Sequence, residues 1–498
     1  MSFAWILFII YLLATAWIGW QGQKRTKGFN SFALGNKDVH PVFVGITLAA
    51  SVASAATFII NPGFIYVDGF SAWFHMVIGL GLGFIAMLYF LSFQFRRIGE
   101  ENKALTIPDW IGKQYKSRNF ALFFSILNLL SFAFVVLLVG GISIVMQSLL
   151  GISNSNALLI TLIFVTGYVF IGGTYAHIFT NVLQGSLMIG VTLLVLVSCL
   201  TLLNDSPDSF VNRLNAINPD LLSMVNTNGR LFNDVFSIYV AGFIIGAVVV
   251  CQPHILTKAL YVKNDKQVKQ YLSVFTVLWI LFLLLGSVGF FAHLILPEGA
   301  LIDPVTGLFR QDLVMTAYLE NMFPGWVHTL ASVILIAAAM STLDGLLISI
   351  STITANDLVL NLFNKKHKLD HEAQMKFALR VSHIVLVVIA IAAYFINLNP
   401  PKLLGIFGQI GVYGLTVAAA PPLIMGVMYK NPPLKYVWIS SGTALIIHFG
   451  LYFWGKNIIQ PSSFSFANPG VTAAIAAIIS ITPLLIIARI NKGLFKRI

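Results

Sequence analysis

Residues 326–357 read WVHTLASVILIAAAMSTLDGLLISISTITAND, an almost unbroken apolar run. As a helix, a run of this length is enough to cross a hydrocarbon core of about 30 Å. Only Asp344 places a charge deep within it. Burying an isolated carboxylate in a membrane is costly, so Asp344 needs a cation, a proton or a dense set of hydrogen-bond partners. The stretch therefore predicts a membrane-spanning helix with a polar centre.

Composition extends this prediction to the whole chain. Hydrophobic residues make up 58% of the 498 positions, charged residues only 10%, and the mean hydropathy is +0.87. A soluble domain carries about 25% charged residues, so this chain lacks the polar atoms to cover a water-facing surface. The short alternating segments that build a β-barrel are not seen. Cys199 and Cys251 lie inside apolar runs and fit neither a disulfide framework nor a metal spacing. We expect an all-α integral membrane protein.

Thirteen candidate spans alternate with polar segments along the chain. We interpret the first as a retained transmembrane helix, because no basic segment precedes it and no small-residue cleavage site ends it. The spans lie at about 3–21, 41–67, 70–94, 119–149, 157–176, 180–203, 235–257, 270–296, 326–357, 377–397, 403–428, 437–455 and 470–488.

The order of these spans predicts one transmembrane domain over 1–498. It consists of an extra helix at 3–21, a first repeat at about 41–203, a second repeat at about 235–428 and accessory helices at about 437–488. The two five-helix repeats enter the membrane from opposite faces, as an inverted repeat requires, and such repeats place the binding site between their first helices. Any ten consecutive spans would alternate in this way, so the pattern permits the repeat without proving it.

The basic residues predict the orientation. Alternating the spans from an outer N-terminus puts most Lys and Arg residues on the cytoplasmic side, which is the positive-inside pattern. The C-terminus is then cytoplasmic, and we expect a multi-pass protein of the cell's inner (plasma) membrane. The net charge of +12 is explained by this orientation and requires no nucleic acid. The outer segments keep only Arg213, Arg230, Arg310, Lys402 and Lys456.

Span 41–67 is polar where it crosses the membrane. Residues 47–57 read TLAASVASAAT, and Asn61-Pro62-Gly63 follow. Small residues allow close helix contact, and hydroxyls can donate hydrogen bonds or act as ligands. Proline removes an amide donor and glycine adds freedom, so Asn-Pro-Gly disfavours a continuous helix. Freed carbonyls are tolerable in a membrane where they face a cavity or an ion. A helix-packing seam is the alternative interpretation.

Span 326–357 carries a second polar centre. Ser341, Thr342, Asp344 and Gly345 occupy about one turn and share a broad face. Sodium is a hard cation that prefers oxygen ligands, and two hydroxyls beside a small-residue backbone can supply them. A capped structural Asp344 is the alternative. Deep histidines such as His75 are more often hydrogen-bonded structural residues than proton relays.

At these residues the sequence resembles the sodium:solute symporter family, particularly its proline and pantothenate branches. The likeness covers about residues 5–430. Besides the Ser/Thr-rich span ending near Pro62-Gly63, it rests on four ordered motifs. They are Gly172-Gly173, Thr180-Asn181 with Gln184-Gly185, Gln252-Pro253-His254-Ile255-Leu256, and Ala339-Met340-Ser341-Thr342-Leu343.

The resemblance implies a LeuT-like inverted-repeat fold that works by alternating access, with sodium as the coupling ion and no other cofactor. It implies a principal sodium site made of the backbone carbonyls of Ala50, Ala53 and Ala338 and the hydroxyls of Ser341 and Thr342. It implies a solute site beside the broken helices, near Ser54, Thr57, His75, Val248 and Gln252.

A second ion site is expected at Asn181, Asp344 and Gly345. Many relatives have aspartate at the position of Asn181 and an uncharged residue at that of Asp344. We hypothesise that the carboxylate has moved across the interface between the two helices, keeping one negative charge near a second ion.

The leading functional interpretation is sodium-coupled symport of a small organic solute, such as the amino acid proline or the small carboxylate pantothenate. One alternative keeps the fold and couples transport to protons through Asp344. A membrane-embedded sensor or enzyme is a further alternative, although no nucleophile–base pair, metal cluster or glycine-rich phosphate loop supports an enzyme. The partners expected are sodium, a small organic solute and the lipid bilayer, without nucleic acid. Which solute is carried, and the oligomeric state, stay open.

Overall fold

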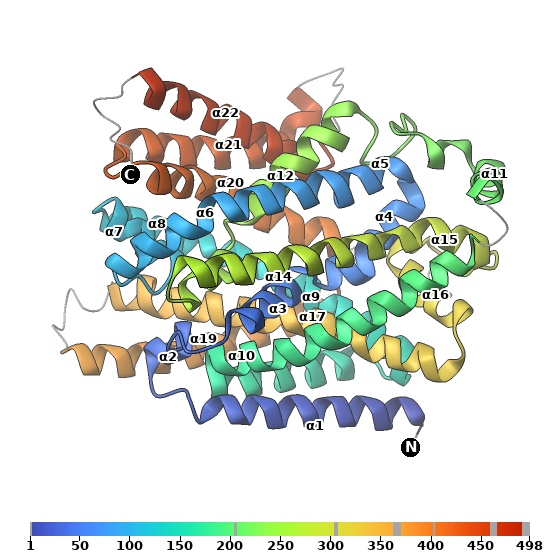
Figure 1. Cartoon of the computed structure of the whole chain (residues 1–498), viewed down its shortest axis with the longest axis horizontal. Coiled ribbons are helices and arrows are strands. Elements are labelled where there is room, and N and C mark those ends of the chain that lie inside the picture. The colour runs from blue at the N-terminus through green and yellow to red at the C-terminus, as the bar shows by residue number, and fades with distance from the viewer. Residues whose placement is uncertain are drawn as a thin grey trace.

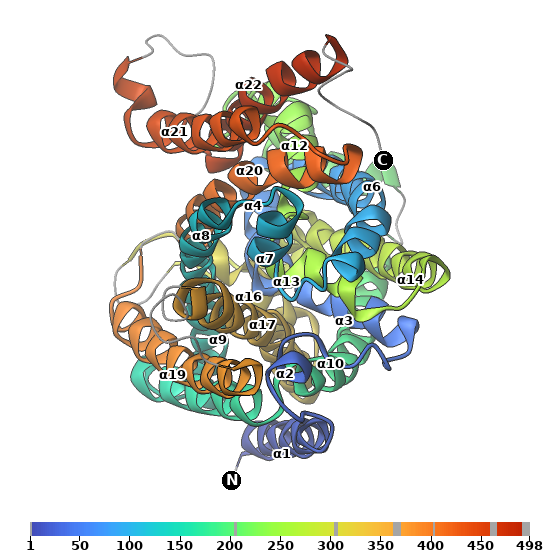
Figure 2. The same cartoon turned by 90° about the vertical axis from the view of Figure 1, so that its left-hand side faces the viewer.

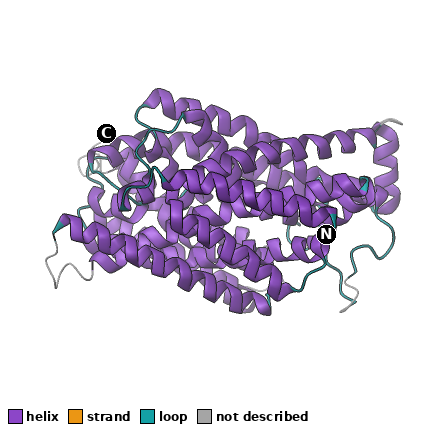
Figure 3. Cartoon of the chain, turned by 90° about the horizontal axis from the view of Figure 1, so that it is seen from below, coloured by secondary structure: helices purple, strands orange, loops and turns teal. Residues whose placement is uncertain are grey.

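The computed structural model of the chain describes residues 2–203, 207–302, 307–361, 370–401, 404–458 and 466–490. Within these ranges the regular elements are helices, and β-type pairing is limited to isolated bridges such as that between Ile302 and Phe309. Helices fill the body of the molecule (Figure 3). The predicted all-α class is therefore confirmed. Some basic residues used to predict the orientation lie outside the described ranges: Lys365, Lys366, Lys368, Lys402, Lys492, Lys496 and Arg497.

Long apolar helices make up most of the bundle. They are α1 (Phe3–Gln23), α6 (Leu80–Glu101), α9 (Phe132–Leu150), α10 (Asn154–Thr201), α14 (Asp265–Leu284), α17 (Gly325–Ile353), α19 (His371–Leu398), α20 (Leu404–Met428), α21 (Leu434–Ile458) and α22 (Pro469–Ile490). Shorter helices connect or extend them: α2 (Phe29–Leu34), α5 (Phe70–Trp73), α7 (Ile107–Gln114), α8 (Arg118–Leu127), α11 (Pro207–Ile217), α15 (Val288–Ile295) and α16 (Val314–Met322). Short 3₁₀ or π turns join several of them: η2 (Phe74–Gly79), η3 (Asn128–Ser131), η4 (Pro219–Leu222), η7 (Leu285–Ser287), η8 (Gln311–Leu313) and η9 (Thr354–Leu360).

Two further spans are broken in the middle. In the first, α3 (Pro41–Val52) is followed by η1 (Ala56–Ile60) and α4 (Asn61–Asp68), with a bend of 53°. In the second, η5 (Phe236–Val240) and α12 (Ala241–Val249) are followed by α13 (Pro253–Leu256) and η6 (Thr257–Tyr261), with a bend of 62°. These are the first helices of the two predicted repeats, so both repeats begin with an interrupted span.

The first break does not lie where the sequence predicts it. The backbone leaves the helix at Ala53, whose φ and ψ are −77° and 71°, and not at Asn61-Pro62-Gly63. Pro62 lies where the π turn η1 continues into α4 with helical backbone angles at Ile60 and Asn61, so the proline does not interrupt the helix there. Gly63 serves close packing, since a Cβ at that position would lie 2.1 Å from the carbonyl O of Gln311.

The long helices run side by side along the length of the bundle (Figure 1). α1 begins at the right-hand end, while α2, α7 and α8, which lie in or beside the predicted basic cytoplasmic segments, are at the left-hand end. Viewed onto that end, α1 lies at one margin, α21 and α22 lie at the other, and α17, α3 and α13 lie between (Figure 2). In the apolar stretch of the span that contains α17, 94% of the residues are buried inside the protein, whereas in α1 the share is 22%. α17 is therefore a central helix, and α1 is peripheral.

The described residues contain ten long apolar helices and the two bent pairs, which makes up to 12 spans. The expected thirteenth arises because the sequence divides α10 into two spans. Gly173 interrupts α10 with φ 50° and ψ −139°, a conformation that favours glycine. The segments before and after it are each long enough to cross a hydrocarbon core of about 30 Å. Thirteen spans remain a prediction.

Candidate functional site

Hydroxyl–carbonyl contacts join the end of α3 to the middle of α17. Ser341 Oγ lies 2.8 Å from the carbonyl O of Ala50 and 2.7 Å from that of Ala338. Thr342 Oγ1 donates to the carbonyl of Ser51 at 2.8 Å. These five residues, all fully buried, are called the oxygen cluster below. A hydroxyl has one proton and two lone pairs, so both side chains can rotate to present oxygen to a cation.

Ala53 is the one predicted sodium ligand that takes no part in these hydrogen bonds. It lies at the break, where its N–H donates to the carbonyl of Ala49 at 2.9 Å. Just beyond it, the N–H of Ser54 bonds only two residues back, to Val52, at 2.9 Å. The structure thus brings together Ala50, Ala338, Ser341 and Thr342 and adds Ser51.

A third helix, α10, reaches the oxygen cluster through Asn181. Its Nδ2 donates to Ser51 Oγ at 2.9 Å and to the carbonyl of Ser341 at 2.8 Å. Close approach of α10 to α3 depends on Gly185, because a Cβ there would lie 2.8 Å from Ile46 Cγ2. Asn181 therefore contacts both helices that supply the cluster.

Asp344 has a separate environment one turn along α17. It is fully buried, and its Oδ1 lies 2.8 Å from His177 Nδ1. Its Oδ2 accepts from the Tyr168 hydroxyl at 3.0 Å and lies 3.3 Å from Thr180 Oγ1. The amide of Asn181 points to the oxygen cluster instead. The structure thus gives the three residues of the expected second ion site different surroundings.

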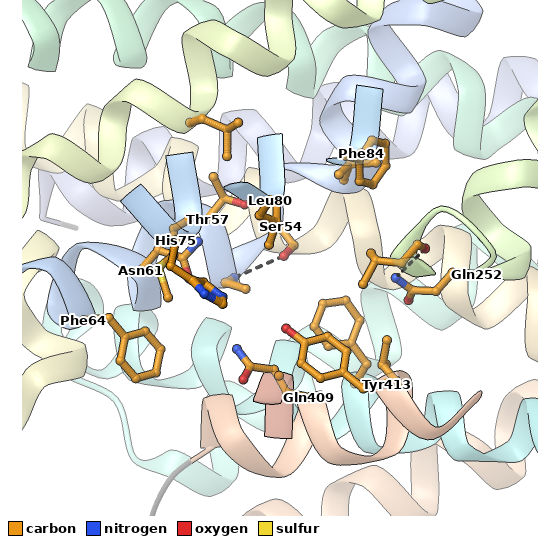
Figure 4. A pocket seen from close by; sticks show the side chains of 18 of the residues that line it. Ser54, Thr57, Asn61, Phe64, His75, Leu80, Phe84, Gln252, Gln409 and Tyr413 are labelled. Carbon is orange, nitrogen blue, oxygen red and sulfur yellow. Dashed lines mark hydrogen bonds between the residues drawn. The ribbon is translucent and has the colours of Figure 1, made fainter. Parts of the chain in front are cut away.

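A cavity of about 110 Å³ lies next to the oxygen cluster. Figure 4 shows Ser54, Thr57 and His75 facing Gln409 and Tyr413 across it, with Gln252 at one end. Of the predicted solute-site residues, Ser54, Thr57, His75 and Gln252 line this cavity, while the position of Val248 is taken in the lining by Val249. Ser51 belongs to both the lining and the oxygen cluster, so the two sites are adjacent.

The lining combines neutral polar groups with aromatic rings. None of the described residues around it is Lys, Arg, Asp or Glu. Gln252 Oε1 is buried without a hydrogen-bond partner among the described residues, so it can accept a bond from a bound molecule. His75 is held by the Ser237 carbonyl, 2.6 Å from its Nδ1. The aromatic walls are Phe64, Phe84, Phe134, Phe232, Trp279 and Tyr413.

Several residues of this region escape sequence reasoning. Ser51 lies within the small-residue run quoted above. Its carbonyl is available to Thr342 because the helix breaks at Ala53, and the sequence does not predict that position. Asn468 reaches the cavity from just before α22, which counts as an accessory helix in the sequence. Lys258 follows α13 closely and resembles a loop residue in the sequence, yet only 1% of its surface is exposed. The described residues hold no group of three or more His, Cys, Asp or Glu side chains suited to a metal ion.

Comparison with known proteins gives three concordant results. The model of the sodium:solute symporter family matches residues 32–432. The chain is 28% identical to a sodium/pantothenate symporter of Haemophilus influenzae, over 90% of this chain and 88% of that protein. It is 26% identical to a sodium/proline symporter of Escherichia coli, over 89% and 87%.

Among solved structures, a Na⁺-coupled sialic acid symporter in a substrate-bound, outward-open state superimposes with a TM-score of 0.76. The sequence identity is 17%, and the match covers 100% of this chain and 98% of that one. A transporter of the nucleobase-cation-symport-1 family gives a TM-score of 0.50 at 14% identity, covering 93% and 95%. At these identities the likeness concerns the fold alone, and it confirms the LeuT-like architecture implied by the sequence.

Proposed function

The chain belongs to the sodium:solute symporter family, and from this premise we propose that its oxygen cluster is the sodium site that drives uptake of a small organic acid or amino acid. Membership makes the protein a membrane transporter that couples solute movement to sodium, and not an enzyme. The residues that perform the coupling, the chemical class of the solute and the orientation of the chain are the subjects of the proposal.

The hydroxyl–carbonyl contacts of Ser341 and Thr342 with α3 carry the proposal. Carbonyl and hydroxyl oxygens are the ligands that a hard monovalent cation prefers. Sodium binds between the carbonyls of Ala50 and Ala338 and both hydroxyls, and Ala53 completes the site when the break closes around the ion. The ion then adds a further link between two helices that the hydrogen bonds of Ser341, Thr342 and Asn181 already join at this level.

Sodium binding favours solute binding through Ser51 and Ser54, which lie between the ion and the cavity. The carbonyl of Ser51 faces Thr342, and its neighbours up to Ser54 form the cavity wall. An ion that fixes the end of α3 therefore also fixes the shape of the solute site. By linkage, the solute must raise sodium affinity by the same factor.

The cavity lining favours a solute with a single carboxylate, or a zwitterion. Amides and hydroxyls can hydrogen-bond such a molecule, but no arginine or lysine of the lining is present to neutralise it. Transferring an unpaired carboxylate from water to this apolar environment would be costly. The adjacent sodium supplies the missing positive charge, which explains why solute binding needs the ion. The relatives named for proline and pantothenate carry solutes of this kind.

The left-hand end of the bundle in Figure 1 is the cytoplasmic face in this proposal. The described segments 24–37, 96–118 and 258–269 lie there and carry most of the described Lys and Arg residues. Basic connecting segments remain on the cytoplasmic side of the cell membrane during insertion. The N-terminus is then outside and the protein spans the plasma membrane.

The experiment is uptake by purified protein in lipid vesicles, tested with radiolabelled proline, pantothenate, other small carboxylates and sugars. We expect accumulation of one carboxylate or amino acid under an inward sodium gradient. Uptake of that solute at acidic pH in sodium-free buffer would instead favour proton coupling. Preference for an uncharged sugar would contradict the solute class.

A further inference from the structure

Lys258 and Asp344 are two buried charges without a salt bridge to an oppositely charged Lys, Arg, Asp or Glu side chain within the described part of the chain. Buried Arg96, by comparison, pairs with Glu100 and Asp265. Lys258 Nζ has the carbonyl of His254 as its hydrogen-bond partner, at 2.7 Å. An uncompensated buried charge is strongly unfavourable, so each of the two requires a counter-charge nearby.

The Asp344 carboxylate is satisfied by hydrogen-bond donors from α10. A carboxylate only accepts hydrogen bonds, so His177 must carry its proton on Nδ1, which lies 2.8 Å from Oδ1. The Tyr168 hydroxyl donates to Oδ2 at 3.0 Å. A protonated ring nitrogen has no lone pair for sodium, so this side of the carboxylate is closed to a metal ion.

Gly345 provides space for the imidazole. A Cβ at this position would lie 3.0 Å from His177 Cε1, tighter than ordinary contact. A serine or threonine there could offer a hydroxyl to an ion but would displace the ring. The glycine therefore favours the histidine–carboxylate pair over a second set of oxygen ligands.

Lys258 supplies the countercharge. Its hydrogen-bond partner, His254, lines a small cavity of about 20 Å³ together with Gly345 and His177, the residue that contacts the Asp344 carboxylate. Thr257, the residue before Lys258, also lines this cavity with His177 and Gly345. The turn that carries Lys258 therefore packs against this part of α17 and α10. A hydrogen bond to the His254 carbonyl holds the ammonium group in the turn formed by α13 and η6. Unlike a bound ion, this positive charge cannot dissociate.

We propose that Lys258 takes the place of a second coupling ion, so that the carrier binds a single sodium ion, at the oxygen cluster. This inference rests on the proposed function, because it presumes that the oxygen cluster binds sodium. Asp344 then has a structural and electrostatic role: it compensates Lys258, and His177 and Tyr168 hold it in position. This proposal takes the place of the expectation that Asn181, Asp344 and Gly345 bind a second ion.

The test is saturation binding of radioactive sodium to the purified protein, which needs no knowledge of the solute. The variants are Asp344→Asn, Lys258→Met and the double variant, with Lys263→Met, an exposed lysine nearby, as matched control. We expect the wild type, Asp344→Asn and Lys263→Met to bind the same amount per protein. In Lys258→Met the amount should roughly double, because the carboxylate then lacks a countercharge and can recruit a cation at Oδ2, beside the hydroxyl oxygens of Tyr168 and Thr180. The double variant should return to the wild-type amount.

Two outcomes overturn the inference: a wild type that loses a sodium ion on Asp344→Asn, or a Lys258→Met variant that gains none. If Lys258→Met does not fold, the Asp344→Asn result alone still decides the first point. Failure of the proposed function looks different, since sodium would then bind to none of these proteins, or would bind unchanged after loss of both cluster hydroxyls.

Discussion

Replacing Ser341 by alanine removes one hydroxyl from the oxygen cluster and leaves the carbonyls in place. In the structure this hydroxyl lies 2.8 Å from the Ala50 carbonyl and 2.7 Å from the Ala338 carbonyl. A hydrogen bond or ligand contact involving a charged group contributes about 1.5–3 kcal/mol. At about 1.4 kcal/mol for each factor of ten, sodium affinity should fall about 10- to 150-fold.

Equilibrium binding of radioactive sodium to the purified variant measures this loss. Ser351→Ala is the matched control, because Ser351 is equally buried on the same helix and, among the described residues, its hydroxyl bonds to the Ile348 carbonyl alone. Sodium affinity should be unchanged in the control. If Ser341→Ala binds sodium as tightly as Ser351→Ala does, the hydroxyl is no ligand and the reasoning fails.

Three further changes test other parts of the account. Gln252→Leu removes the unpartnered acceptor of the cavity and should raise the KM for the solute about tenfold, the effect of losing about 1.4 kcal/mol. Val248→Ala, a change outside the lining, should leave the KM unchanged, and equal KM values for the two variants would contradict the solute site. Gly173→Ala forces a side chain into φ 50° and should lower the unfolding temperature, through a strain of about 1–2 kcal/mol, whereas an unchanged thermal melt would refute the kink. Asn468→Ala frees the carbonyl of Leu231, which borders the cavity, and should speed solute release in a filter-binding chase; an unaltered release rate would show that this contact does not retain the solute.

The sequence predicts the elements of the fold better than the places where they break. Apolar length identifies spans, because a helix must cross a fixed thickness of hydrocarbon. Pro62 is a misleading signal, since it lies where the π turn η1 runs on into α4, and a π turn accommodates the proline without a break. The true break at Ala53 lies among alanines and serines with no individual preference for it, so it depends on packing against α17 and α10.

The site shows the same contrast. Ser341 and Thr342 can be predicted because polar residues are rare in such a span. The partners of Asp344 cannot, because His177 is 167 positions away and contacts it only once α10 and α17 are packed. Lys258 resembles a cytoplasmic loop residue in the sequence, and it is the bend between Val249 and Pro253 that carries it into the protein.

The central claim is that sodium, held between α3 and α17, drives the solute across the membrane. Its most direct test compares solute accumulation in vesicles under a sodium gradient with accumulation under an equal choline gradient, for the wild type and for Ser341→Ala/Thr342→Val. The account predicts that the wild type accumulates solute only with sodium and that the double variant accumulates none. Accumulation by the double variant at the wild-type level, or by the wild type with choline, would contradict it.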